Sequence, residues 1–122
     1  MKFKDDSPIF LQIKEEIINQ IISGVLKEDS AIPSIRTMAQ EYKLNPNTIS
    51  RAVTELVNDG ILYKKRGIGL FVNVGIKDKL KREMIVHFKT IEFSRCINRA
   101  NKLGIKKNVI IGEVEKIYNK EA

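Results

Sequence analysis

The strongest local pattern in the sequence covers residues 34–60, where two short amphipathic segments follow each other across a tight turn. Ser34 is a typical helix cap for the first segment, which extends to about Lys43. Asn45 is a second cap, followed by a proline at the first helical position of a segment that ends at Asp59-Gly60. Two short helices joined in this way predict a helix-turn-helix, in which the second helix is shaped to enter the major groove of DNA.

Two short apolar runs follow this pair of segments. Residues 61–64 and 70–74 each have strand composition, and the loop Lys65–Gly69 between them holds two glycines, which predicts a β-hairpin. An earlier helix is expected to begin at Ser7-Pro8 and to end at Gly24, with isoleucines at four-residue spacing. The order helix, helix, helix, hairpin is that of a winged helix-turn-helix domain, which we assign to residues 1–75.

Residues 76–122 are predicted to form a helical tail, so the fold class is mainly α with a small β-hairpin. A long helix is expected from Asp78 to Leu103, with an apolar stripe that shifts around its axis, and a last helix is expected over residues 107–119. Residues 78–118 hold too many large apolar side chains for a tail that is exposed to solvent. We expect these side chains to pair two copies of the chain; folding back on the same subunit is the alternative. The expected dimerisation residues are Leu80, Met84, Phe88, Ile91, Ile97, Leu103, Val114 and Ile117.

The composition narrows the classes of function. The net charge of +7 favours an anionic partner, although residues 77–122 contribute most of it. A single cysteine, Cys96, excludes an internal disulfide and a cysteine-rich zinc site, and the one histidine, His87, has no partner at metal or triad spacing. No run is long enough to span a bilayer and no secretory signal is evident, so a cytoplasmic protein without a metal or cofactor is expected.

The helix that begins after Asn45 has the residue types that recognise DNA. Asn47 and Arg51 are four residues apart on its polar face; asparagine is suited to adenine, and arginine to guanine or phosphate. Thr48 and Ser50 are suited to phosphates. An ordinary exposed polar face is the alternative interpretation.

Two further basic positions support the same hypothesis. Arg36 lies in the first turn of its helix, where a cation is unfavourable for the helix dipole unless an external anion, such as a DNA phosphate, is its partner. Lys64, Lys65 and Arg66 precede Gly67 in the hairpin loop, and such a loop is able to lie along phosphates or to enter the minor groove. A helix arginine with an acidic neighbour and a plain hairpin with solvated lysines are the alternatives.

The stretch from Pro8 to Val72 resembles the GntR family of bacterial winged-helix repressors. The matching segments, in order, are residues 8–13, 22–26, 32–36, 44–52, 60–62 and 66–72. The short two-helix tail resembles the YtrA-like subfamily, which implies a dimer; many such proteins repress operons that include ABC-transporter genes. The family usually has a basic residue between the two glycines of the hairpin loop, where this chain has Ile68.

From the residues and the resemblance together we expect a homodimeric repressor on a pseudo-palindromic operator, with double-stranded DNA as partner. A protein-interaction module without DNA binding is the alternative, an enzyme is not expected, and any small-molecule effector is left unidentified. The expected DNA-binding residues are Ser34, Arg36, Asn45, Asn47, Thr48, Ser50, Arg51, Lys65, Arg66 and Gly67.

Overall fold

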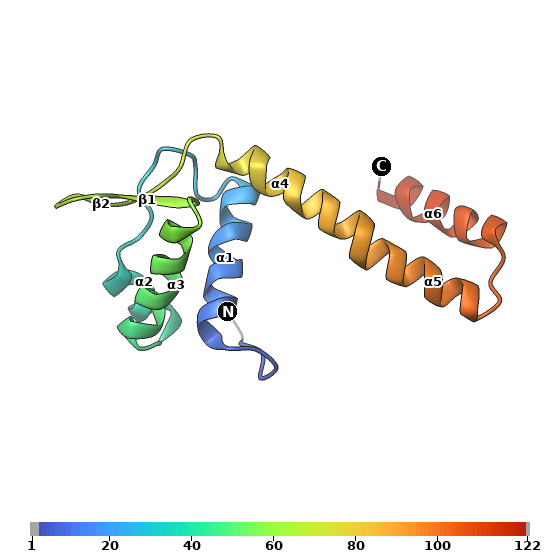
Figure 1. Ribbon diagram of the computed structural model, residues 1–122, viewed down its shortest axis with the longest axis horizontal. Coiled ribbons are helices and arrows are strands. Elements are labelled where there is room, and N and C mark those ends of the chain that lie inside the picture. Colours follow the sequence, from blue (N-terminus) through green and yellow to red (C-terminus); the bar gives the residue numbers. More distant parts are fainter. Residues whose placement is uncertain (1–2, 122) are drawn as a thin grey trace. The chain divides into compact units, whose positions relative to one another are not determined.

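The computed structural model describes residues 3–121. They fall into two compact units, Met1–Arg82 and Glu83–Ala122. The described residues form helices with one two-stranded antiparallel sheet, as shown in Figure 1. The mainly helical class with a small β-hairpin, predicted from the sequence, is confirmed.

The first unit contains three helices and a hairpin, in the predicted order. Its helices are α1 (Ile9–Ser23), α2 (Ile35–Tyr42) and α3 (Pro46–Asn58), and its strands are β1 (Leu62–Lys65) and β2 (Gly69–Val72). The first helix is expected to begin at Pro8 but begins at Ile9, because Pro8 occupies the capping position. Its side chain makes no capping hydrogen bond.

The caps predicted for the next two helices are present. The side chain of Ser34 accepts a hydrogen bond from the backbone N–H of Thr37, and that of Asn45 accepts one from the N–H of Asn47. Each cap satisfies an amide that the helix itself leaves unpaired. Between the two helices Lys43 adopts a left-handed conformation with φ 56°, which ends α2 and turns the chain into α3.

The core of the first unit is formed by aliphatic side chains with helical and strand periodicity. Ile13, Ile17 and Ile21 of α1 are completely buried at four-residue spacing. The remaining fully buried large side chains come from α3 and from the two strands, and they are Ile49, Leu56, Leu62 and Val72. Each such side chain contributes about 1.5–3 kcal/mol by leaving water, so the core fixes both the back of α3 and the base of the hairpin.

The hairpin is a short two-stranded ribbon extended by one bridge. Leu62 pairs with Val72 and Lys65 with Gly69, so the strands run closer to the tip than the expected runs 61–64 and 70–74. Ala31, in the connection before α2, forms an isolated bridge with Phe71. Gly67 has φ 78° at the tip, a left-handed conformation that glycine adopts without steric cost.

The following helix, α4 (Ile76–His87), begins earlier than the expected Asp78 and contributes to the first unit. Ile76 and Leu80 are buried in the same aliphatic core as α1 and α3. Leu80, which the sequence hypothesis places in a dimer seam, is only 7% exposed and packs within its own subunit, so it offers little surface to a second copy. For the same reason the first unit extends beyond residue 75 to Arg82.

The second unit contains the end of α4, the π-helical segment η1 (Phe88–Phe93), α5 (Ser94–Lys102) and α6 (Lys107–Glu121). The expected long helix thus contains a π-helical stretch at the point where its apolar stripe shifts. A π-turn has more residues than an α-turn, so it rotates the following side chains around the helix axis. Among the described residues of the unit only Ala100 is buried. No described helix of the chain is long and apolar enough to cross a membrane.

Candidate nucleic-acid interface

The helix α3 divides into a buried face and an exposed polar face, as the sequence predicts. Ile49, Ala52 and Leu56 are completely buried against the rest of the first unit. Asn47 and Arg51 are exposed, while Thr48 and Ser50 are partly covered. The outward side of α3 therefore presents amide, hydroxyl and guanidinium groups, which are the groups that recognise base edges and phosphates.

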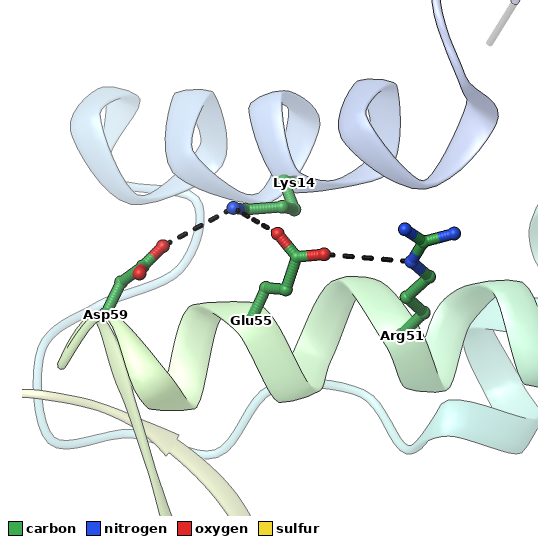
Figure 2. Close-up of polar contacts among 4 residues, drawn as sticks. All are labelled: Lys14, Arg51, Glu55 and Asp59. Atoms are coloured by element: carbon green, nitrogen blue, oxygen red, sulfur yellow. Dashed lines mark hydrogen bonds and ion pairs between the residues drawn. The ribbon is translucent and has the colours of Figure 1, made fainter.

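Arg51 has a fixed place on this face. Its guanidinium carbon lies 3.7 Å from the centre of the Phe10 ring in α1, and its Nε lies 3.8 Å from Glu55 Oε2. Figure 2 shows the Nε facing Glu55, with the two terminal amino groups beyond it. The side chain is nevertheless 65% exposed, so the terminal groups are accessible to a ligand.

The carboxylate beside Arg51 is shared with a lysine of α1. Lys14 Nζ donates to Glu55 Oε1 at 3.0 Å and to Asp59 Oδ2 at 3.4 Å, as Figure 2 shows. Partial burial by itself would lower the pKa of Lys14, but the hydrogen bonds and charges of Glu55 and Asp59 outweigh it and raise that pKa above its ordinary value. Arg51, Glu55, Lys14 and Asp59 therefore form a linked set of charges between α1 and α3.

A groove of about 630 Å³ lies on the other flank of α3, between the start of α2, α3 and the hairpin. Arg36 lines it from α2, Ser50 and Thr54 from α3, and Lys64 from β1. Ile35, Val53 and Leu70 contribute apolar walls. Ser34, before α2, adds a third hydroxyl. Two cations and three hydroxyls around one groove form a surface that is complementary to a phosphate–sugar strand.

The hairpin separates its neighbouring lysines. Lys64 lines the groove, whereas the Nζ of Lys65 lies 4.5 Å from the centre of the Phe71 ring and 5.9 Å from that of Tyr63. The two rings stack on each other at 5.6 Å. Because successive strand residues point to opposite faces, only one of the two lysines is able to face the groove. The sequence hypothesis named Lys64, Lys65 and Arg66 together as a basic loop and kept Lys65, but not Lys64, among the expected DNA-binding residues.

The face that carries Lys65 is joined to the connection before α2. The hydroxyl of Tyr63 donates to Asp29 Oδ1, and this bond with the carboxylate raises the pKa of Tyr63. Asp29 has a left-handed backbone with φ 58° and its N–H donates to the carbonyl of Val72 at 2.7 Å. These contacts hold the base of the hairpin against the preceding loop and so fix the direction of its tip.

The other expected DNA-binding residues have distinct positions. Ser34 and Asn45 both use their side-chain oxygens to cap helices. Arg66 and Gly67 lie at the exposed tip of the hairpin, beside Ile68, which is 74% exposed. The structure thus brings Ser34, Arg36 and Ser50 together in the groove and places Arg51 on the opposite flank of α3, against Phe10.

Two members of this surface, Thr54 and Lys64, are absent from the list of expected DNA-binding residues. Thr54 lies one turn beyond Ser50, and helical periodicity already places it on the polar side of α3. Lys64 required the strand register, because a shift of one residue exchanges the two faces. Within the described residues no group of three or more histidine, cysteine, aspartate or glutamate side chains is placed to hold a metal ion.

The comparison with protein families gives a match over the first unit. The family model described as bacterial regulatory proteins, gntR family, matches residues 10–72, which is more than half of the chain. The chain belongs to the GntR family. The residues that form the groove and the polar face of α3 all lie within the matched range.

Individual relatives extend the similarity over nearly the whole of this chain. The HTH-type transcriptional repressor YtrA of Bacillus subtilis is 29% identical over 94% of this chain and 82% of its own length. The structure of a GntR family transcriptional regulator from Listeria monocytogenes has a TM-score of 0.78 and 31% identity, over 93% of this chain and 98% of that one. The predicted resemblance to YtrA-like GntR regulators is confirmed.

Some of the similar structures are complexes with operator DNA. The AraR DNA-binding domain in complex with operator ORX1 has a TM-score of 0.54 and 33% identity, over 59% of this chain and 92% of that one. This chain is therefore a DNA-binding transcriptional regulator with a winged helix-turn-helix domain.

Proposed function

We propose that this chain is a sequence-specific repressor that acts as a homodimer on a pseudo-palindromic operator. The observation that supports this most directly is the division of α3, which buries Ile49 and Leu56 and leaves Asn47 and Arg51 exposed. A helix with one face locked in a core and the other polar is suited to lie in the major groove.

Within this proposal the two flanks of α3 have different tasks. Asn47 and Arg51 recognise base edges, because asparagine and arginine make bidentate contacts with adenine and guanine. Arg36, Ser50 and Lys64 hold one strand of the duplex by its phosphates in the groove, together with Thr48 at the start of α3. Phosphate contacts set the register of the protein on DNA, and base contacts select the sequence.

The hairpin tip contributes a contact of its own. Arg66 is exposed beside Gly67 and Ile68, so the tip offers one cation and one apolar side chain to the adjacent minor groove. Minor-groove proteins use arginine together with apolar side chains in this way. Ser34 and Asn45 act through their caps, which fix the first turns of α2 and α3 against the duplex.

The homodimer is supported by the apolar surface of the second unit. Phe88, Leu103 and Ile117 are all more than half exposed. The further seam residues Met84, Ile91 and Val114 are exposed as well, and Ile97 is partly covered. An apolar groove of about 450 Å³ lies between α5 and α6, lined by Phe93, Ile97, Ile110 and Val114 among others. Exposed apolar surface of this extent marks an interaction site, and we assign it to a second copy of the chain.

Two copies would place two α3 helices in successive major grooves, with half-sites about one helical turn apart. A repressor of this kind works on DNA in the cytoplasm. Operons that include transporter genes are the targets that the YtrA-like resemblance implies, and identification of the operator in the genome tests this part of the proposal.

The test is selection of bound sites from random DNA by the full chain, followed by titration of the selected duplex and an unrelated duplex. We expect a preference for the selected duplex, with affinities for both that fall as salt rises. Arg51→Ala is expected to lower affinity for the selected duplex by about 1–3 kcal/mol. Arg95→Ala, in the second unit, is the matched control and should leave the preference unchanged.

A protein-interaction module is the rival function. It would select no sequence and show no salt-dependent binding of either duplex, and this outcome would refute the proposal. Equal weakening of both duplexes by Arg51→Ala would instead assign Arg51 to the DNA backbone and leave base recognition to Asn47.

A further inference from the structure

Arg51 is unusual among the cations of the first unit because contacts from two helices restrain it. Its guanidinium carbon lies 3.7 Å from the centre of the Phe10 ring, a distance at which a flat cation stacks on an aromatic face. Phe10 is itself partly buried and packs against the aliphatic core. The ring is therefore a fixed platform, and one face of the guanidinium is covered by it.

The Nε edge of the same guanidinium is also engaged. It faces Glu55 Oε2 at 3.8 Å, and the other oxygen of that carboxylate accepts from Lys14 at 3.0 Å. Lys14 in turn is held by Asp59, so Glu55 has little freedom to move away. With one face and the Nε edge engaged, the edge with the two terminal amino groups remains for a ligand. Figure 2 shows these two groups beyond the Nε that faces Glu55.

We propose that Phe10 and Glu55 are positioning residues that hold the Arg51 guanidinium with its two terminal amines directed outward, and that they thereby determine sequence preference. This inference rests on the proposed function, in which Arg51 contacts a base. Two parallel donors are what guanine recognition by arginine requires, since O6 and N7 accept them side by side. A guanidinium ordered before binding loses less conformational freedom on contact with the base.

A similar arrangement is not available to the cations on the other flank. Arg36 and Lys64 line an open groove, and the structure gives neither of them an ion pair or an aromatic partner within the described residues. Flexible cations are adequate for phosphates, because the phosphate charge is recognised without a fixed donor pattern. The contrast between the flanks is the reason to assign sequence preference to the restrained cation.

The experiment compares variants of the full chain on the duplex selected by the wild-type protein and on an unrelated duplex. Phe10→Leu removes the ring and keeps apolar volume, and Phe10→Tyr keeps the ring. Glu55→Gln keeps the shape and removes the charge. Glu15→Gln is the matched control, because Glu15 is exposed on α1 and the structure gives it no ion pair within the described residues.

We expect Phe10→Leu and Glu55→Gln each to reduce the preference for the selected duplex by about 2- to 5-fold, the ratio that a cation–aromatic contact at an exposed site supplies. Phe10→Tyr and Glu15→Gln should retain the preference. In an Arg51→Ala background, Phe10→Leu should cause no additional loss, because the group that it positions is absent.

A second measurement reports on the position of Arg51 without DNA. In the free wild-type protein the Phe10 ring should shift the Arg51 side-chain proton resonances upfield, and the shift should disappear in Phe10→Leu and return in Phe10→Tyr. If the Arg51 resonances are unchanged in Phe10→Leu, the guanidinium does not stack on the Phe10 ring and the inference is wrong.

The outcomes separate this inference from the proposed function. If Phe10→Leu weakens both duplexes equally, or weakens binding further in the Arg51→Ala background, then Phe10 acts only through packing and the inference is wrong. If Arg51→Ala abolishes the preference while Phe10→Leu and Glu55→Gln retain it, the function stands without the positioning residues. If the wild-type protein selects no sequence, the proposed function and this inference both fail.

Discussion

Lys64 and Lys65 are neighbours in the chain, yet they lie on opposite faces of the β-hairpin. Lys64 lines the groove that contains Arg36 and Ser50. Lys65 lies over the Phe71 ring on the other face. The hairpin therefore presents Lys64 to the DNA strand that we propose for the groove, whereas Lys65 packs on the aromatic pair of the other face.

Lys64→Ala should weaken DNA binding on selected and unrelated sequences alike and lower the salt dependence by about one phosphate contact. Lys65→Ala removes the same charge from the chain and is the matched control. A salt titration of both variants checks this, and it should leave the slope of Lys65→Ala close to that of the wild-type protein. Equal changes in the two slopes would contradict the assignment of Lys64 to the groove.

Leu80→Ala should lower the free energy of unfolding of the first unit by about 2–5 kcal/mol, because it leaves a cavity in an aliphatic core. Its oligomeric state should not change, since the side chain is buried within one subunit. Leu103→Ala, at a side chain that is 66% exposed, is the comparison and should leave unfolding of the first unit nearly unaffected. Urea unfolding together with sedimentation separates the two effects.

Ile117→Asp should weaken the proposed homodimer by at least about 100-fold, because a carboxylate would be moved into an apolar interface. Asn119→Asp introduces the same charge at an exposed polar position of α6 and should leave association unchanged. Sedimentation over a concentration series measures both dissociation constants. Persistence of the Ile117→Asp dimer would show that the seam lies elsewhere.

Stability at alkaline pH should depend on Lys14. Its folded-state pKa is raised above 10.5 by Glu55 and Asp59 despite the opposing effect of burial. The stabilisation is therefore fully present below pH 10.5 and is lost as the pH rises through the raised value. Lys14→Met should lack this component, so its unfolding curve should depend less on pH in that range. The difference should be small, because the ion pairs are partly solvated.

Much of the first unit could be predicted because its signals are local. The caps Ser34 and Asn45 act on amides two or three residues away, and the isoleucines of α1 have the spacing of one helix face. The division of α3 into aliphatic and polar sides follows from the same periodicity. These properties depend on neighbours along the chain, which a sequence displays directly.

The differences at Leu80 and at the two hairpin lysines depend on packing or pairing between separate segments. Leu80 has the spacing of the later apolar stripe, but the start of α4 at Ile76 brings it into the core of the first unit. The faces of Lys64 and Lys65 depend on strand register, and the ends of short strands are poorly marked in a sequence. The stripe shift was visible in the sequence, whereas its cause, the π-helical stretch Phe88–Phe93, was not.

The sequence by itself determined which helices form, where two of them are capped and which face of α3 is polar, because short-range periodicity and capping specify these properties. The order of its motifs also carried the resemblance to the GntR family. Only the tertiary structure decided that Arg51 lies on the Phe10 ring and that Arg36, Ser50 and Lys64 share a groove. The physical reason is that these relationships join side chains from different elements, and their distances are fixed by the common core that all the elements bury.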